Sequence, residues 1–236
     1  MGITHNMQFI IIIICVGDPD QCKAPVDNFV RYDKNPLFLS MCGNYVVTLK
    51  YKEGFSRYDR ELYEVLISYN DKKTLVWECD EIESYINICY TNSTRHKLNE
   101  RCFKRWVEEN DSDVVSFGFP VCVGLPVMAY DDADKALGIF KTQVWKVEKI
   151  DKKEIVLSKD EKEVSLDKQS FRRIFPYAFC MTAHKCQGLT IREPYNIYEA
   201  DLMSAEVLYT ALSRGVKKEF VHIPRCRSQA YEEMKR

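Results

Sequence analysis

The chain has 236 residues, of which 46% belong to the hydrophobic set and 29% are charged, with 34 Lys and Arg against 35 Asp and Glu. This composition excludes a disordered chain, a collagen and a membrane bundle. The length is enough to bury one large domain, or a main domain with a small insert. Because the formal net charge is −1, any surface for nucleic acid must be a local concentration of basic side chains.

The N-terminal apolar run Phe9 to Val16 ends in the polar turn Gly17 to Gln21. The run is shorter than the roughly 20 residues that span a bilayer, so we expect no membrane segment. A β-branched run that ends in a Gly/Pro turn is typical of a strand buried in a parallel sheet. Ligands bind at the carboxyl ends of such strands, which places the turn at a functional edge.

The elements that follow alternate between strand and helix. The pattern predicts a strand over 44–49, a helix over 57–69, a buried strand over 85–91 and a basic helix over 95–108. The order strand, polar turn, helix indicates an α/β fold with a parallel sheet and flanking helices.

The sequence pattern changes between residues 121 and 175, where short β-rich segments are separated by charged turns and no helix is predicted. This pattern predicts a small antiparallel β insert within the α/β domain. Trp145 alternates with valines in one of its strands, which favours burial over base stacking.

The ten cysteines show no pattern of a metal site or a disulfide framework. No C-x-x-C pair occurs, and several cysteines lie inside apolar runs, where a free thiol packs as a small hydrophobe. We therefore expect no bound metal of this kind and a reducing intracellular compartment.

The most specific stretch runs from Tyr177 to Thr190 and is followed by Tyr209 to Gly215. These stretches resemble motif V (T-x-H-K-x-Q-G-x-T) and motif VI (Y-V-A-L-S-R) of superfamily 1 DNA helicases. Gly17 to Gln21 resembles motif III (G-D-x-x-Q), and Tyr90 to Asn99 resembles the T-N-x-x-R-x-x-x-N segment. The four motifs occur in the family's order, so the resemblance spans most of the chain.

This resemblance implies a RecA-like sheet, and the β insert fits the phage and recombination helicase branch, which carries an SH3-like subdomain before motif V. Lysine- and cysteine-rich spacers suggest a large DNA virus. The implied parts are the end of the first RecA-like lobe with motif III (1–50), the first part of the second lobe (51–125), the SH3-like insert (126–175), and the rest of the second lobe with motifs V and VI (176–236).

A nucleic-acid motor must sense the γ-phosphate across the cleft between its lobes. Arg suits this task because its guanidinium binds phosphate through two N–H groups and stays protonated. The resemblance makes Arg214 the arginine finger and Arg57, or its neighbour Arg60, the motif IV arginine. It also makes Gln21 the residue that couples the γ-phosphate to the strand. The residues expected at the nucleotide are Gln187, Gly188 and Asp18.

The motif V loop is expected to hold the nucleic-acid backbone through amides and hydroxyls, which positions a strand without reading its sequence. The residues assigned to the strand are Thr182, His184, Lys185, Thr190 and Asn92. A structural histidine is the alternative for His184, and a helix N-cap is the alternative for Asn92. The implied partner is single-stranded DNA, with RNA left open.

Two parts of a complete helicase ATPase do not occur in the sequence. There is no Gly-Lys-Ser/Thr loop for the phosphates, and the acidic segment that most resembles a Mg²⁺ site, Leu75 to Glu81, follows motif III instead of preceding it. We therefore expect ATP and Mg²⁺ to bind only with a first lobe supplied elsewhere, and the chain alone to be inactive.

The alternative function is a noncatalytic module for nucleic acid or a replication partner, or a truncated helicase remnant. Either protein would work inside the cell, in the host cytoplasm or nucleus if the source is viral.

Overall fold

The computed structural model describes most of the chain, and the strand expected before Gly17 lies outside the described residues. The described residues are 17–18, 20–21, 32–72, 79–130 and 137–224.

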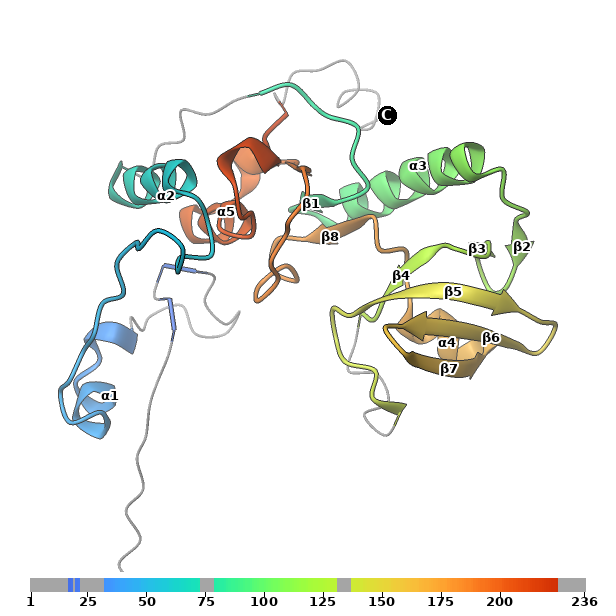
Figure 1. Ribbon diagram of the computed structural model, residues 1–236, viewed down its shortest axis with the longest axis horizontal. Coiled ribbons are helices and arrows are strands. Elements are labelled where there is room, and N and C mark those ends of the chain that lie inside the picture. Colours follow the sequence, from blue (N-terminus) through green and yellow to red (C-terminus); the bar gives the residue numbers. More distant parts are fainter. Residues whose placement is uncertain (1–16, 19, 22–31, 73–78, 131–136, 225–236) are drawn as a thin grey trace, which may run out of the picture.

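A four-stranded parallel sheet forms the centre of the α/β part (Figure 1). Its strand order is β10-β9-β1-β8, and every neighbouring pair is parallel. The strands are β1 (Asn87–Cys89), β8 (Cys180–Thr182), β9 (Tyr195–Ile197) and β10 (Val221–His222). All residues of β1, β8 and β9 are buried, as expected for strands covered on both faces. The α/β fold predicted from the sequence is confirmed.

Helices cover both faces of this sheet (Figure 1). On one face, α3 (Asn92–Asn110) packs through Leu98 against Cys89 and Cys180. On the other, α2 (Arg60–Lys72) and α5 (Ala205–Leu212) share a core with strand residues such as Ile88. Successive residues of a strand point to opposite faces, which explains why Ile88 and Cys89 belong to different clusters.

Local capping fixes where two of these helices begin. The helix predicted over 57–69 is confirmed as α2, and Asp59 Oδ1 accepts a hydrogen bond from Leu62 N at 2.8 Å near its start. The helix predicted over 95–108 is confirmed as α3 and begins earlier, because Thr91 caps it through Thr94 N at 3.2 Å. Asn92 is the first residue of α3, so the N-cap alternative for it is wrong.

The predicted antiparallel insert is confirmed as a sheet of order β4-β5-β6-β7. Its strands are β4 (Pro126–Met128), β5 (Val144–Ile150), β6 (Glu154–Lys159) and β7 (Lys162–Asp167). The expectation of no helix between 121 and 175 is wrong at α4 (Lys168–Ile174), which Asp167 caps. A hairpin of β2 (Val115–Ser116) and β3 (Pro120–Val121) precedes it. Trp145 is 1% exposed in the core of the insert, as its alternation predicts.

The strand predicted over 44–49 does not form. This segment follows η1 (Tyr32–Lys34) and α1 (Pro36–Met41), and the structure gives it neither a strand nor a bridge partner. Tyr45, Val47 and Leu49 are 86%, 83% and 86% exposed. β-branched residues favour a strand only where a neighbouring strand accepts their hydrogen bonds, and this segment has none among the described residues.

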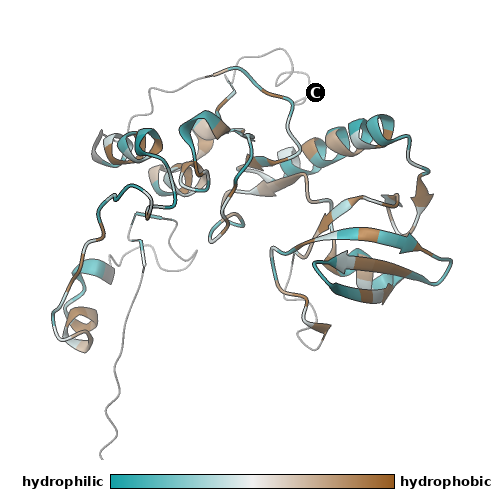
Figure 2. Ribbon diagram, in the orientation of Figure 1, coloured by the Kyte–Doolittle hydropathy of each residue, from teal (hydrophilic) through white to brown (hydrophobic). Residues whose placement is uncertain are grey.

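Apolar side chains are also exposed on α1, which Figure 2 colours as hydrophobic. Leu37 is 72% exposed and Met41 is 57% exposed. Two short 3₁₀ turns, η3 (Ala200–Leu202) and η4 (Lys218–Phe220), complete the described elements. No helix among the described residues is long and apolar enough to cross a bilayer.

Candidate nucleotide and nucleic-acid site

The carboxyl ends of three neighbouring parallel strands carry most of the residues predicted for the site. Asn92 follows β1, the segment from His184 to Thr190 follows β8, and Glu199 follows β9. Ligands of parallel α/β sheets bind at this edge because the loops that leave it converge there. The predicted strand-binding residues are thus brought to one edge. We call Thr182, His184, Lys185, Thr190 and Asn92 the edge cluster.

Glu199 holds two of these loops together and was not found from the sequence. Its side chain is 7% exposed. One carboxylate oxygen accepts hydrogen bonds from Tyr90 N at 3.0 Å and Thr91 N at 2.8 Å, and the other accepts from the hydroxyls of Thr91 at 3.0 Å and Thr94 at 2.7 Å. These partners are more than 100 residues away along the chain, so no local motif could indicate them.

The loop after β8 turns sharply. The Thr182 carbonyl accepts hydrogen bonds from Lys185 N at 2.8 Å and Cys186 N at 3.1 Å. Gly188 has a φ of +88°, a conformation that favours glycine. Thr182 is buried at the base of the loop, whereas His184, like Thr190 and Asn92, is exposed.

His184 lies beside a second ring at the same edge. Its ring centre is 6.2 Å from that of Tyr90, which directly follows β1. Tyr90 is 37% exposed. The edge cluster therefore carries two accessible rings, whose planes are tilted by 39° to each other.

Lys185 points toward the β insert. Its Nζ donates to the Tyr130 carbonyl at 3.0 Å and lies 4.2 Å from the centre of the Tyr130 ring. The guanidinium of Arg95 lies 4.4 Å from the same ring centre. Arg95 is 7% exposed, and its Nε is buried without a hydrogen-bond partner. The cationic groups of Lys185 and Arg95 thus both contact one aromatic ring where the α/β part joins the insert.

Arg214 is buried directly after α5. Its guanidinium donates to the Thr210 carbonyl at 2.8 Å, the Leu189 carbonyl at 3.2 Å and Ser213 Oγ at 2.7 Å. Arg214 is 1% exposed. Burial lowers the pKa of Arg214, and the nearby charge of Arg57 lowers it further. An arginine nevertheless remains protonated at neutral pH.

Arg57 and Arg214 both donate hydrogen bonds to Ser213. Arg57 is exposed and donates a hydrogen bond to the Ser213 carbonyl. Arg60, the alternative motif IV arginine, instead pairs with Glu64 at 3.0 Å on the surface of α2, where the two side chains are 78% and 64% exposed. The geometry therefore favours Arg57 over Arg60 as the partner of Arg214.

The described part of Gly17 to Gln21 contacts the same region. Asp18 Oδ2 accepts hydrogen bonds from the Tyr209 hydroxyl at 3.4 Å and from Gln21 Nε2 at 3.1 Å. Asn70 Nδ2 donates to Asp20 Oδ2 at 2.6 Å. Burial raises the pKa of Tyr209, and the charge of Asp18 raises it further. We call Arg214, Arg57, Asp18 and Gln21 the arginine cluster.

Gln187 and Gly188 lie between the two clusters. Both are exposed in the loop after β8. The next residue, Leu189, gives its carbonyl to Arg214, and Ile191 N donates to the Arg214 carbonyl at 2.8 Å. One loop therefore connects the edge cluster to the arginine cluster. Among the described residues, no group of three or more His, Cys, Asp or Glu is arranged to hold a metal ion.

No protein-family model and no curated relative matches the chain. Solved structures do match it. One describes two coordinating Pif1 helicases at forked double-stranded DNA, with a TM-score of 0.54 and 19% identity over 75% of this chain and 49% of that chain. Bacteroides Pif1 bound to ssDNA gives 0.52 and 17%, over 75% of this chain and 51% of that one. Bacteroides Pif1 with ADP-AlF3 and ssDNA gives 0.51 and 19%, over 73% and 51%.

The chain therefore has the fold found in part of these helicases, a RecA-like sheet with flanking helices. Its structural neighbours are Pif1 helicases of superfamily 1, and the chain spans about half the length of those it matches.

Proposed function

We propose that this chain is the C-terminal part of an ATP-dependent DNA helicase, which binds single-stranded nucleic acid and completes the ATP site of a first lobe. The observation that carries the proposal is the convergence of Arg57 and Arg214 on Ser213, joined by one loop to the edge cluster. Coupling between nucleotide and strand requires such a physical connection.

The arginine cluster is the proposed nucleotide side. A transferred phosphoryl group carries negative charge in its transition state, which a guanidinium from the opposite lobe stabilises. Arg214 is the proposed arginine finger, Arg57 the motif IV arginine and Gln21 the link to the first lobe. Gln187, Gly188 and Asp18 border the nucleotide. ATP with its Mg²⁺ would supply the phosphates, and the acidic ligands of the metal would come from the first lobe.

The edge cluster is the proposed strand side. Exposed His184, Thr190 and Asn92, at the ends of neighbouring strands, suit contacts to a nucleic-acid backbone. The neighbours described as bound to ssDNA support single-stranded DNA as the partner, with RNA left open. Thr182 and Lys185 are assigned a positioning role within this loop, because one is buried and the other binds Tyr130.

A first lobe from outside these residues is part of the proposal. The sequence lacks the Walker A loop, and apolar side chains from Leu37 to Leu49 are exposed where residues 1–50 would join that lobe. The same proposal places the divisions of the chain at residues 50, 125 and 175 and makes the insert SH3-like. It also includes a phage-like or viral origin and a role in DNA replication or repair.

Hydrolysis assays test this function. The purified chain should hydrolyse ATP no faster than background, with or without ssDNA. Adding a first lobe that carries a Walker A loop should give ssDNA-stimulated hydrolysis, which Arg214→Lys should abolish because an ammonium cannot replace the fork of guanidinium donors. Turnover by the chain alone would contradict the proposal. The noncatalytic alternative, which the missing loop favours, predicts strand binding and no hydrolysis in any mixture.

A further inference from the structure

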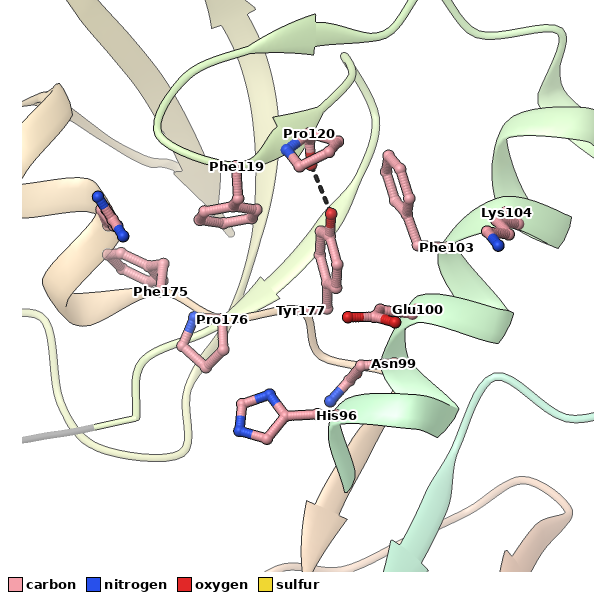
Figure 3. A pocket seen from close by; sticks show the side chains of 11 residues that line it. His96, Asn99, Glu100, Phe103, Lys104, Phe119, Pro120, Phe175, Pro176 and Tyr177 are labelled. Carbon is pink, nitrogen blue, oxygen red and sulfur yellow. Dashed lines mark hydrogen bonds between the residues drawn. The ribbon is translucent and has the colours of Figure 1, made fainter. Parts of the chain in front are cut away.

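A pocket of about 550 Å³ lies between α3 and the base of the β insert (Figure 3), and no residue of either cluster lines it. One side is α3 with His96, Glu100 and Lys104, and the other is formed by Phe119, Phe175 and their neighbours. A volume of this size is in the range of small-ligand pockets.

The pocket has a rigid aromatic wall. Phe103 and Tyr177 stack with ring centres 4.7 Å apart at 7°, and Phe119 packs edge-on against Tyr177 at 5.1 Å. The Tyr177 hydroxyl donates to the Pro120 carbonyl at 2.6 Å, which fixes the ring (Figure 3). Phe119 and Tyr177 are both partly exposed, so ring surface is accessible from the pocket.

Lys104 and Arg172 border the pocket without a carboxylate partner among the described residues. Arg172 borders the pocket and also a second hollow of about 540 Å³, which Lys168 and Arg173 line. In the part of the chain that the structure describes, Lys104 and these three residues form no ion pair or side-chain hydrogen bond. A side chain added at Gly118, whose φ is +94°, would place its Cβ 3.3 Å from Arg172 Cδ, so a glycine leaves room for the stem of Arg172. Glu100 is the one carboxylate at the pocket.

Stacking surface next to unpaired cations is the arrangement that holds single-stranded nucleic acid, because bases stack on rings and phosphates pair with Lys and Arg. The pocket begins at His96, one helical turn from Asn92 in the edge cluster, and ends at Lys104, which lies about 18 Å from Asn92 along α3. A strand that lies on the edge cluster can therefore continue along α3 to the pocket.

We infer that this pocket is a second strand-binding subsite, which takes a nucleobase against Phe119 and Tyr177 while Lys104 and Arg172 bind the adjoining phosphates. The inference rests on the proposed function and extends its strand path. Glu100 accepts a hydrogen bond from a base N–H at the pocket, such as N3–H of thymine, and keeps phosphates on the side of Lys104 and Arg172.

Fluorescence anisotropy with oligothymidines of two lengths tests the inference, one of about 8 nucleotides and one of about 20. The double variant Lys104→Ala/Arg172→Ala should bind the long oligonucleotide about tenfold more weakly and the short one as wild type does. Its slope of log K against log salt should be shallower by about 1.4, for two lost phosphate contacts. The charge-matched control Lys152→Ala/Lys153→Ala, in the exposed β5–β6 turn, should bind both lengths as wild type does.

Replacing the long oligonucleotide's thymidines by abasic units should lower the affinity of the wild type more than that of the double variant. Equal loss in both proteins, or wild-type binding of the long oligonucleotide by the double variant, would overturn the inference and leave the proposed function standing. Failure of the wild type to bind either length would instead overturn the proposed function.

Discussion

The arginine cluster and the edge cluster are connected by one loop but are built differently. Arg214 is 1% exposed and its donors bind groups of the protein itself. His184 and Asn92 are exposed at the ends of their strands. A buried side chain held by internal hydrogen bonds, such as that of Arg214, therefore contributes to stability as well as to its proposed role at the nucleotide. An exposed side chain can serve binding with little structural cost.

The largest expected effect is in the arginine cluster. Arg214→Ala removes the donors of the Thr210 and Leu189 carbonyls in a buried place, so the free energy of unfolding should fall by about 3 kcal/mol. Urea unfolding followed by circular dichroism measures it. The matched control is Arg60→Ala, which removes only the exposed pair with Glu64 and should change stability by less than about 0.5 kcal/mol. If the two variants lower the free energy of unfolding equally, the buried hydrogen bonds of Arg214 do not stabilise the fold.

The next effect belongs to the support of the edge cluster. Glu199→Gln keeps the shape of the side chain but turns one acceptor oxygen into a donor facing N–H or O–H groups. The stability should fall by about 2 kcal/mol, as measured by the same urea titration. Glu193→Gln, at an exposed position, is the control and should be neutral. If Glu199→Gln is also neutral, the bonds to Thr91 and Thr94 do not fix the start of α3.

A smaller effect on stability and a clear effect on binding are expected at the exposed edge. The double variant His184→Ala/Asn92→Ala removes surface side chains, so its unfolding free energy should change by less than about 0.5 kcal/mol. Its affinity for single-stranded DNA should fall several-fold, as measured by anisotropy, because these groups are proposed to contact the backbone. If this double variant unfolds more easily but binds single-stranded DNA as wild type does, the edge cluster supports the fold and not the binding of the strand.

The smallest effect is expected at Asp167, outside both clusters. Asp167 caps α4 by accepting from Gln169 N at 2.8 Å and Ser170 N at 2.9 Å. The Ser170 amide and hydroxyl lower the pKa of Asp167, followed by the Gln169 amide. Because the folded pKa is below the unfolded value of about 3.9, this carboxylate stabilises the fold above that pH. Its contribution is lost as the pH falls through the folded pKa.

Asp167→Asn should keep the helix cap but remove part of the loss of stability that the wild type shows as the pH falls. Thermal unfolding between about pH 2 and pH 6 would measure this dependence. A curve that falls as steeply as that of the wild type would mean that the charge of Asp167 does not support α4.

The parallel sheet, its flanking helices and the antiparallel insert could be predicted from the sequence because each depends on local periodicity and turn residues. The strand over 44–49 could not be corrected from the sequence, since it lacks a neighbouring strand among the residues that the structure describes, and pairing between strands cannot be read from one segment. Glu199 and Tyr130 were missed for a similar reason, because their partners are distant in sequence and meet only when the sheet forms. Motifs predicted which residues gather at the edge, but not that Lys185 turns toward the insert.

The most direct test of the account is the binding of single-stranded DNA by the purified chain, measured by anisotropy with a labelled oligothymidine. Binding should be saturable, should weaken as the salt concentration rises, and should be stronger than binding to duplex DNA of the same length. The double variant His184→Ala/Asn92→Ala should bind more weakly than the wild type. Absence of binding, or equal binding by this variant, would contradict it.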